Sequence, residues 1–176
     1  MFTYTRKNSK PIFLKFIIIV VLSILISNLI FSYFIFTEVI GPSMNPLLKN
    51  KDLILVLKNA YTRSSPKFLD IVAIRDSDKK NPPIIKRIIG LPNDKITIKN
   101  SELFINDKLI NEPYIKEKMI NNSIINLTIP KNSYFVMGDN RNCSMDSRDE
   151  SIGIISKNQI IGKGVISLIP LKLLYS

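Results

Sequence analysis

The stretch IIKRIIGLPNDKITIKNSELFI, residues 84–105, decides the fold of this 176-residue chain. Its first part is rich in isoleucine, and its last part alternates apolar and polar residues on both sides of Asn100-Ser101. Alternation with a period of two is the pattern of a β-strand with one buried face. Asn and Ser are favoured in tight turns, so residues 95–105 are predicted to form a β-hairpin.

The chain after Ser43 continues in the same way, as short β-branched or alternating runs punctuated by Gly, Pro, Asn and Asp. No long segment of this part shows the 3.6-residue period of an amphipathic helix. The sequence therefore predicts a mainly β domain with several hairpins. Strands are expected at residues 53–57, 70–74, 84–89, 95–98, 103–106, 125–129, 134–137 and 165–169.

The N-terminal part contains a long apolar run, with no charged residue between Phe16 and Thr37. As a helix this run would span roughly 33 Å, enough for the ~30 Å hydrocarbon core of a bilayer. The apolar region of a cleaved signal peptide is only about 7–15 residues long and ends at a small-x-small site. A buried helix of a soluble protein is the other alternative, and it fits such a long uncharged run poorly. We expect a basic tail at residues 1–15, a retained transmembrane anchor at 16–37 and an external domain at 38–176.

The orientation of this anchor follows from the basic residues near its ends, because Lys and Arg favour the cytoplasmic side. Four basic residues precede the anchor and two follow it closely, which predicts a cytoplasmic N-terminus and a domain outside the cytoplasmic membrane. Residues 38–176 keep a net charge of +7, which fits a solvated basic surface or attraction to anionic lipid, whereas nucleic acid is a poor fit for an external domain. The basic residues are Arg6, Lys7, Lys10 and Lys15 before the anchor, and Lys49 and Lys51 after it.

Histidine is absent from the chain, and Cys143 is its single cysteine. This composition excludes Ser-His-Asp and Cys-His nucleophile pairs, histidine-bearing zinc sites and internal disulfides. We expect no metal and no cofactor, so any hydrolytic chemistry must use Ser, Lys, Asp or Glu. The pattern Ser64-x-x-Lys67 matches one Ser/Lys motif, but it lies beside Pro66 in a loop-like stretch without that motif's partner sequences.

Three other segments are dense in candidate catalytic residues. GPSMNPLL, residues 41–48, places Ser43 in a Gly-Pro turn; it is a candidate nucleophile or a simple linker turn. In the strand 84–89, alternation puts Lys86 and Arg87 on opposite faces, so one cation should face the more buried side unless this is an edge strand in water. A buried amine loses its proton readily. GDNRNCSMDSR, residues 138–148, surrounds Ser144 with paired acids and bases; alone it could be a salt-bridged loop.

Together these segments resemble the type I signal peptidase family of bacteria. SMNPLL is similar to that family's serine box, KRIIGLPND to its lysine box, and GDNRNCSMDSR to its G-D-N-R-x-N-S-x-D-S-R box. LDIVAIR and GKGVISLIPL also resemble family segments, and all occur in the family's order. The resemblance implies a catalytic domain of coiled antiparallel β-sheet with a smaller β insertion, here expected at about 98–129, behind one N-terminal transmembrane helix.

The resemblance also implies roles for individual residues. Ser43 would be the nucleophile, Lys86 the general base, and Ser144 would hydrogen-bond and orient the Lys86 amine. Gly41 stands where some members carry a serine that contributes to the oxyanion site, so the second oxyanion donor is left open. The other supporting residues, implied to be structural, are Asp146 and Arg148 as a salt bridge, together with Asp139 and Arg141.

The implied substrates are exported preproteins, cut at the end of their signal peptides on the outer face of the membrane through an acyl-enzyme. The partners are therefore such preproteins and the lipid bilayer, and the sequence does not indicate an oligomeric state. Two other classes stay open: a Ser/Lys self-cleaving repressor-like protease and an inactive, membrane-anchored β module. We expect shallow pockets that admit only small side chains, lined by Val39, Ile40, Met44, Leu48, Ile84 and Ile85. The sequence departs from the family pattern at Leu47, Leu69, Asn93 and Cys143.

Overall fold

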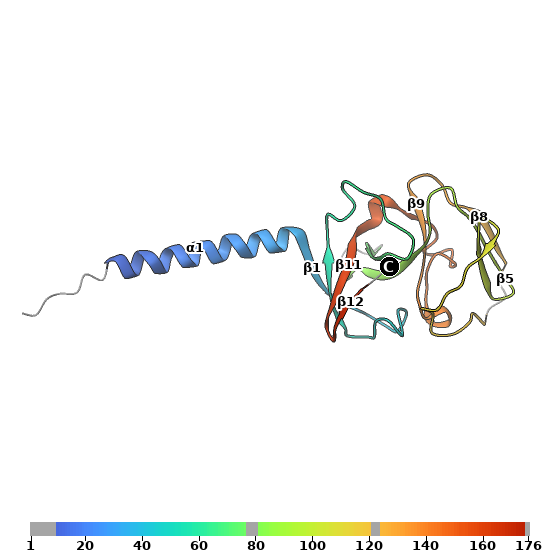
Figure 1. Ribbon diagram of the computed structural model, residues 1–176, viewed down its shortest axis with the longest axis horizontal. Helices are drawn as coiled ribbons and strands as arrows, with labels where there is room; N and C mark the ends of the chain where they lie inside the picture. The colour runs from blue at the N-terminus through green and yellow to red at the C-terminus, as the bar shows by residue number, and fades with distance from the viewer. Residues whose placement is uncertain (1–9, 77–80, 121–123, 175–176) are drawn as a thin grey trace, which may run out of the picture. The chain divides into compact units, whose positions relative to one another are not determined.

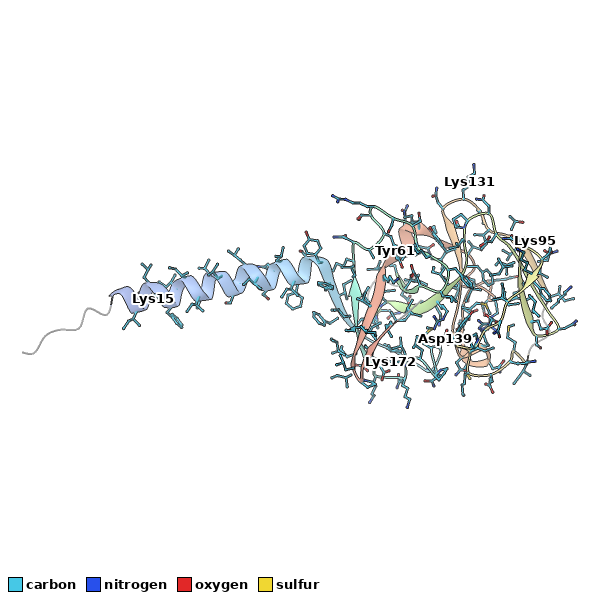
Figure 2. All side chains as sticks on the ribbon, viewed as in Figure 1. Lys15, Tyr61, Lys95, Lys131, Asp139 and Lys172 are labelled. Carbon is cyan, nitrogen blue, oxygen red and sulfur yellow. The ribbon has the colours of Figure 1, made fainter. Side chains whose placement is uncertain are left out.

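The computed structural model of the protein describes residues 10–76, 81–120 and 124–174. The chain divides into two units, residues 1–34 and 35–176, each with its own contacts. The first unit contains helix α1, Lys10–Tyr33, in which residues 12–33 are long and apolar enough to cross a membrane. Side chains of mostly carbon project from all sides of α1, and none of this span is buried (Figure 2). The predicted basic tail lies largely outside the described residues.

The helix ends earlier than the apolar run does. Residues 34–38 form strand β1 (Phe34–Glu38), which is hydrogen-bonded to β2 (Leu53–Leu57) in the sheet. The anchor predicted to continue to Thr37 is therefore helical only as far as Tyr33. Hydropathy could not show this boundary, because Phe34, Ile35 and Phe36 are as apolar as the helix and only pairing with β2 makes them a strand.

In the described part of the chain, the larger of two sheets has eight strands in the order β1-β2-β11-β3-β4-β9-β10, with β12 paired to β11. Strands β11 and β12, at the red end of the colour range, lie side by side in Figure 1. The longest strand of this sheet, β11, runs antiparallel to β2, β3 and β12, and register shifts interrupt its pairing with β2 and β3. Such irregularities bend a strand and increase its twist, which lets the sheet coil. The remaining strands are β3 (Ile71–Ile74), β4 (Ile84–Gly90), β9 (Ser133–Met137), β10 (Ile155–Ser156), β11 (Ile160–Ile169) and β12 (Leu171–Leu173).

A second, four-stranded sheet has the order β7-β6-β5-β8. β5 (Lys95–Lys99) and β6 (Glu102–Ile105) pair antiparallel around Asn100-Ser101, which confirms the predicted hairpin. β7 (Lys108–Leu109) and β8 (Ile125–Thr128) complete this sheet, and short 3₁₀ turns lie at Arg141–Cys143 and Lys157–Gln159. The insertion expected at about 98–129 overlaps this small sheet, whose first strand starts at Lys95. The mainly β fold class is confirmed.

Strands β4 and β9 lie between the hydrophobic cores. On β9, Phe135 and Met137 pack in the core beneath the small sheet, whereas Tyr134 and Val136 pack in a core on the other side. On β4, Ile89 belongs to the first of these cores and Ile88 to the second. Because both faces of these central strands are covered, any polar side chain on β4 must be buried too.

Candidate active site

Ser43 lies in a tight turn that follows β1. Gly41 has a φ of +81°, a conformation that glycine adopts at little cost, and its N–H donates to the side chain of Asn50 at 2.8 Å. After Ser43 the Leu48 N–H donates to the Met44 carbonyl at 2.9 Å, closing the turn. The side chains of Met44 and Leu48 are fully buried in the core under β2 and β3. These two apolar residues therefore fix the turn that carries Ser43.

Lys86 occupies the middle of β4, where it pairs with Val72 of β3. It is only 4% exposed, and so is its neighbour Arg87. Both cations are buried, whereas the alternation of the strand predicted that one of them would face the more buried side. β4 is not an edge strand, because a hydrogen-bonded strand lies on each side of it. Burial lowers the pKa of Lys86 to about 8; the Asp146 carboxylate opposes this effect and Arg148 adds to it.

Ser43 and Lys86 line the same cavity, which has a volume of about 330 Å³. The cavity walls are mostly apolar, and such surroundings disfavour the charged form of an amine. Met44 and Leu48, predicted to line this pocket, do not: their buried side chains belong to the core instead. The other lining residues are Val39, Ile40, Ile84 and Ile85, as predicted, with Asp76, Asn81, Pro82 and Pro83.

One wall of this cavity, which the sequence analysis did not predict, is formed by the segment before β4. Asn81-Pro82-Pro83 immediately precedes Ile84, and prolines hold such a segment extended. A consecutive Pro-Pro next to a candidate lysine strand was visible in the sequence. Nothing local, however, indicated that this segment faces the turn that carries Ser43.

The loop of residues 138–148 contains the third candidate group. The Ser144 hydroxyl is buried and lies near the Asp146 carboxylate, whose pKa it helps to lower; its orienting role toward Lys86 stays a prediction. Asp146 accepts the Gly138 N–H at 3.0 Å and pairs with Arg148 at 2.8 Å, the predicted salt bridge. Burial would raise the pKa of Asp146, but Arg148 and the Gly138 N–H hold it below its usual range. Asp146 is therefore a fixed carboxylate close to Lys86.

Asp139 and Arg141 also make ion pairs, each with a partner outside the loop. Asp139 accepts two hydrogen bonds from Arg87 of β4, at 2.7 and 2.6 Å, and it lies inside the β domain (Figure 2). Arg141 donates to Glu112, between β7 and β8, at 2.7 and 2.5 Å. The ring of Tyr114 lies 4.4 Å from the Arg87 guanidinium and 5.9 Å from that of Arg141. Sequence reasoning missed Glu112 and Tyr114, which no motif marked.

The loop also touches the backbone of the Ser43 turn. The Asn140 N–H donates to the Ser43 carbonyl at 2.9 Å, and the Asn140 amide group donates to the Pro42 carbonyl at 3.1 Å. Gly138 is packed so closely that a Cβ there would overlap the Ser43 carbonyl oxygen and the Ser144 hydroxyl. Two segments distant in the sequence, the Ser43 turn and the 138–148 loop, thus lie against each other.

Other features of the domain lie apart from the shared cavity. A larger cavity of about 610 Å³ contacts Ser144 and Arg148 on the side of the small sheet, but neither Ser43 nor Lys86 lines it. Ser64, the serine of the Ser64-x-x-Lys67 pattern, which we call the decoy motif, is exposed, and its hydroxyl donates to the Ala60 carbonyl at 2.8 Å. In the described part of the chain, no three His, Cys, Asp or Glu side chains are grouped so that they could hold a metal ion.

Comparison with known proteins gives consistent matches. A model of the family described as signal peptidase, peptidase S26, matches residues 11–169. A signal peptidase I of Bacillus licheniformis is 37% identical over 175 residues, covering 94% of this chain and 91% of that protein. Signal peptidase I P of Bacillus subtilis subsp. natto is 40% identical over 177 residues, covering 94% and 93%. A solved signal peptidase I of Enterococcus faecalis is 28% identical, covers 57% of this chain and 97% of that one, and has a TM-score of 0.48.

Proposed function

The chain belongs to the signal peptidase family, peptidase S26, and we propose that it removes signal peptides from exported preproteins at the outer face of the cytoplasmic membrane. It is a serine peptidase of the signal peptidase I kind, and its apolar helix α1 is consistent with membrane anchoring. One observation carries the proposal for the site: Ser43 and Lys86 line one small, largely apolar cavity, and the pKa of Lys86 is lowered to about 8.

The proposed mechanism uses Lys86 as a general base in its neutral form. The Ser43 hydroxyl oxygen attacks the carbonyl carbon of the scissile peptide bond while its proton passes to the Lys86 amine. The tetrahedral intermediate then breaks its C–N bond, and the Lys86 ammonium returns the proton to the leaving amine. Lys86, neutral again, takes a proton from water, which attacks the Ser43 ester. The signal peptide leaves with a new carboxyl group, and Ser43 recovers its proton.

The surroundings of this pair suggest how charge and orientation are handled. The Ser43 N–H is the proposed donor to the oxyanion of the intermediate. The Gly41 N–H already donates to the Asn50 side chain, so we assign no second donor there. Ser144 is proposed to orient the Lys86 amine, because a hydroxyl that donates to a carboxylate can still accept a hydrogen bond from the amine through its oxygen.

The cavity and the sheet edge suggest the selectivity of the site. Val39, Ile40, Ile84 and Ile85 leave a small apolar space that favours small, uncharged side chains beside the scissile bond. β1 is the terminal strand in the sheet order and leads directly into the Ser43 turn. An extended substrate segment could add to this edge by backbone hydrogen bonds, as in β-augmentation. This arrangement would present the peptide bond to Ser43.

The first prediction tests the catalytic pair. Ser43→Ala and Lys86→Ala should each reduce cleavage of a purified preprotein by at least about 1,000-fold, and the double variant should be hardly worse than either, because both act in one step. The matched controls are Ser64→Ala and Lys67→Ala, which change the same residue types in the exposed decoy motif and should retain wild-type rates. Residual cleavage above one tenth of wild type in Ser43→Ala would refute the assignment of the nucleophile.

A further inference from the structure

The segment between β7 and β8 contacts the 138–148 loop through a buried ion pair. Glu112 accepts two hydrogen bonds from Arg141, whose side chain is fully buried, while that of Glu112 is 7% exposed. Tyr114 donates its hydroxyl to Glu112 at 2.8 Å. Burial, reinforced by the Glu112 charge, raises the pKa of Tyr114, so the hydroxyl keeps the proton that it donates. The carboxylate is therefore held on two sides.

Beyond Tyr114, the same segment makes further hydrogen bonds with the loop. The Lys116 N–H donates to the Asp139 carbonyl at 3.0 Å. The Asn142 side chain donates to the Lys118 carbonyl at 3.0 Å and accepts the Ile120 N–H at 2.9 Å. We call residues 112–120 the strap. Its contacts with residues 139–142 include backbone and side-chain groups, so the two segments are fixed in register.

From this contact, a short path leads to the proposed nucleophile. The Arg141 guanidinium, besides binding Glu112, donates to the Gly138 carbonyl at 3.1 Å. Gly138 packs directly against the Ser43 carbonyl oxygen and the Ser144 side chain. The neighbouring Asn140 N–H donates to the same Ser43 carbonyl. The position of the Ser43 backbone thus depends on a loop whose own position depends on Arg141.

We infer that Glu112 is a positioning residue for the reaction: by pairing with Arg141, it holds the 138–142 loop against the Ser43 backbone and the Ser144 side chain. This inference rests on the proposed function for its kinetic consequence. An unpaired Arg141 would be costly in its buried site, so loss of the Glu112 charge would shift the guanidinium and the Gly138 carbonyl with it. Neither Glu112 nor Arg141 lines the cavity of Ser43 and Lys86, so the strap would affect geometry and not substrate binding.

The test is Glu112→Gln in the full-length protein in detergent, which keeps the side-chain shape and removes the charge. We expect kcat for preprotein cleavage to fall about tenfold with KM within twofold of wild type, because a small misplacement of reacting groups lowers the rate of the chemical step. The ascending limb of the pH profile should keep its midpoint, since Glu112 is not among the charges that act on Lys86. A purely structural role would lower the melting temperature and leave the kcat of the folded enzyme unchanged.

A second readout does not depend on catalysis. Amide hydrogen exchange in peptides covering residues 138–144 should become about tenfold faster in Glu112→Gln, with β2 and β11 unchanged. Asp107→Asn is the matched control, because it makes the same chemical change in the small sheet at an exposed ion pair with Lys95 that does not reach the loop. It should leave exchange and kcat as in wild type.

Each outcome then supports or overturns one statement. If Glu112→Gln does not fold, Tyr114→Phe removes only the hydroxyl that holds Glu112 and should slow kcat by about threefold with faster exchange at 138–144. Unchanged exchange and kcat in the variant that folds would overturn the positioning role. If exchange is faster in Glu112→Gln but the wild-type protein cleaves no preprotein, the structural link between Glu112 and the loop stands and the proposed function is rejected.

Discussion

Lys86 shows how one residue acquires its chemistry from its surroundings. A free lysine has a pKa of about 10.4 and is protonated at neutral pH, when it cannot act as a base. On β4 its amine is desolvated, and this burial lowers the pKa to about 8 against the opposing charge of Asp146. At pH 7 about one Lys86 in ten is then neutral, compared with fewer than one in a thousand for a free lysine. Burial of one amine thus makes its neutral form accessible near neutral pH.

The pH dependence of cleavage follows from this shift. Protonation inactivates the base, so kcat/KM should rise about tenfold per pH unit below pH 8 and level off above it, with a midpoint near 8. The measurement is kcat/KM against pH on a signal-derived peptide in detergent, over a range in which circular dichroism shows the protein folded. A midpoint near 10, as for a free lysine, would mean that the site does not depress the pKa of Lys86.

At the scale of elements, the turn between β4 and β5 passes the chain from one sheet to the other. The Leu91 N–H donates to the Asp94 carboxylate, and the Asn93 N–H donates to the Ile129 carbonyl, each at 2.9 Å. Asn93 has a φ of +72°, in the left-handed region that asparagine tolerates better than most residues. Asn93, one of the departures from the family pattern, thus has a side chain suited to its backbone conformation. Leu69, another departure, has a φ of +70°.

The left-handed conformation of Asn93 has a measurable cost for other residues. Asn93→Ala should lower the free energy of unfolding by about 1 kcal/mol, because alanine is strained at this φ and cannot form local side-chain bonds. Asn93→Gly is the matched comparison, since it removes the same side chain without strain, and it should stay within about 0.5 kcal/mol of wild type. Urea unfolding of the three proteins checks this. Equal stability of the Ala and Gly variants would contradict it.

At the scale of the whole molecule, the two units have opposite surface character. The exposed side chains of α1 are apolar along its span, as a lipid environment requires, whereas the β unit has its own buried cores. Four basic residues precede the uncharged run that starts at Phe16, and two follow it closely, the bias that favours a cytoplasmic N-terminus. A peptidase acting on exported preproteins needs its catalytic unit on the side where those preproteins emerge.

The topology gives a prediction for the intact protein. Protease added to spheroplasts should digest the β unit, and an epitope tag at the N-terminus should be protected until the membrane is permeabilised. The charge bias is the physical reason, and moving basic residues to the segment after α1 should weaken this preference. Protection of the β unit in intact spheroplasts would reverse the orientation and exclude preprotein cleavage at the outer face.

Much of this protein can be predicted from local patterns alone. The apolar run identified the N-terminal helix, alternation with turn residues identified the β5–β6 hairpin, and dense motifs singled out Ser43, Lys86 and the 138–148 loop. Each of these features depends on residues within a few positions of one another. Periodicity, hydropathy and turn chemistry act over that range, so the sequence by itself determined the mainly β class and the long apolar helix.

Only the tertiary structure decided which residues meet. Arg87 pairs with Asp139 across 52 positions, and Arg141 with Glu112 across 29. Ion pairs at such separations depend on the order of strands in the sheets, which no local pattern contains. The same holds for the strand at Phe34–Glu38, which pairing with β2 creates, and for the burial of both Lys86 and Arg87, which follows from cores on both faces of β4. Burial of Lys86 in turn lowers its pKa, because desolvation arises only when distant segments exclude water together.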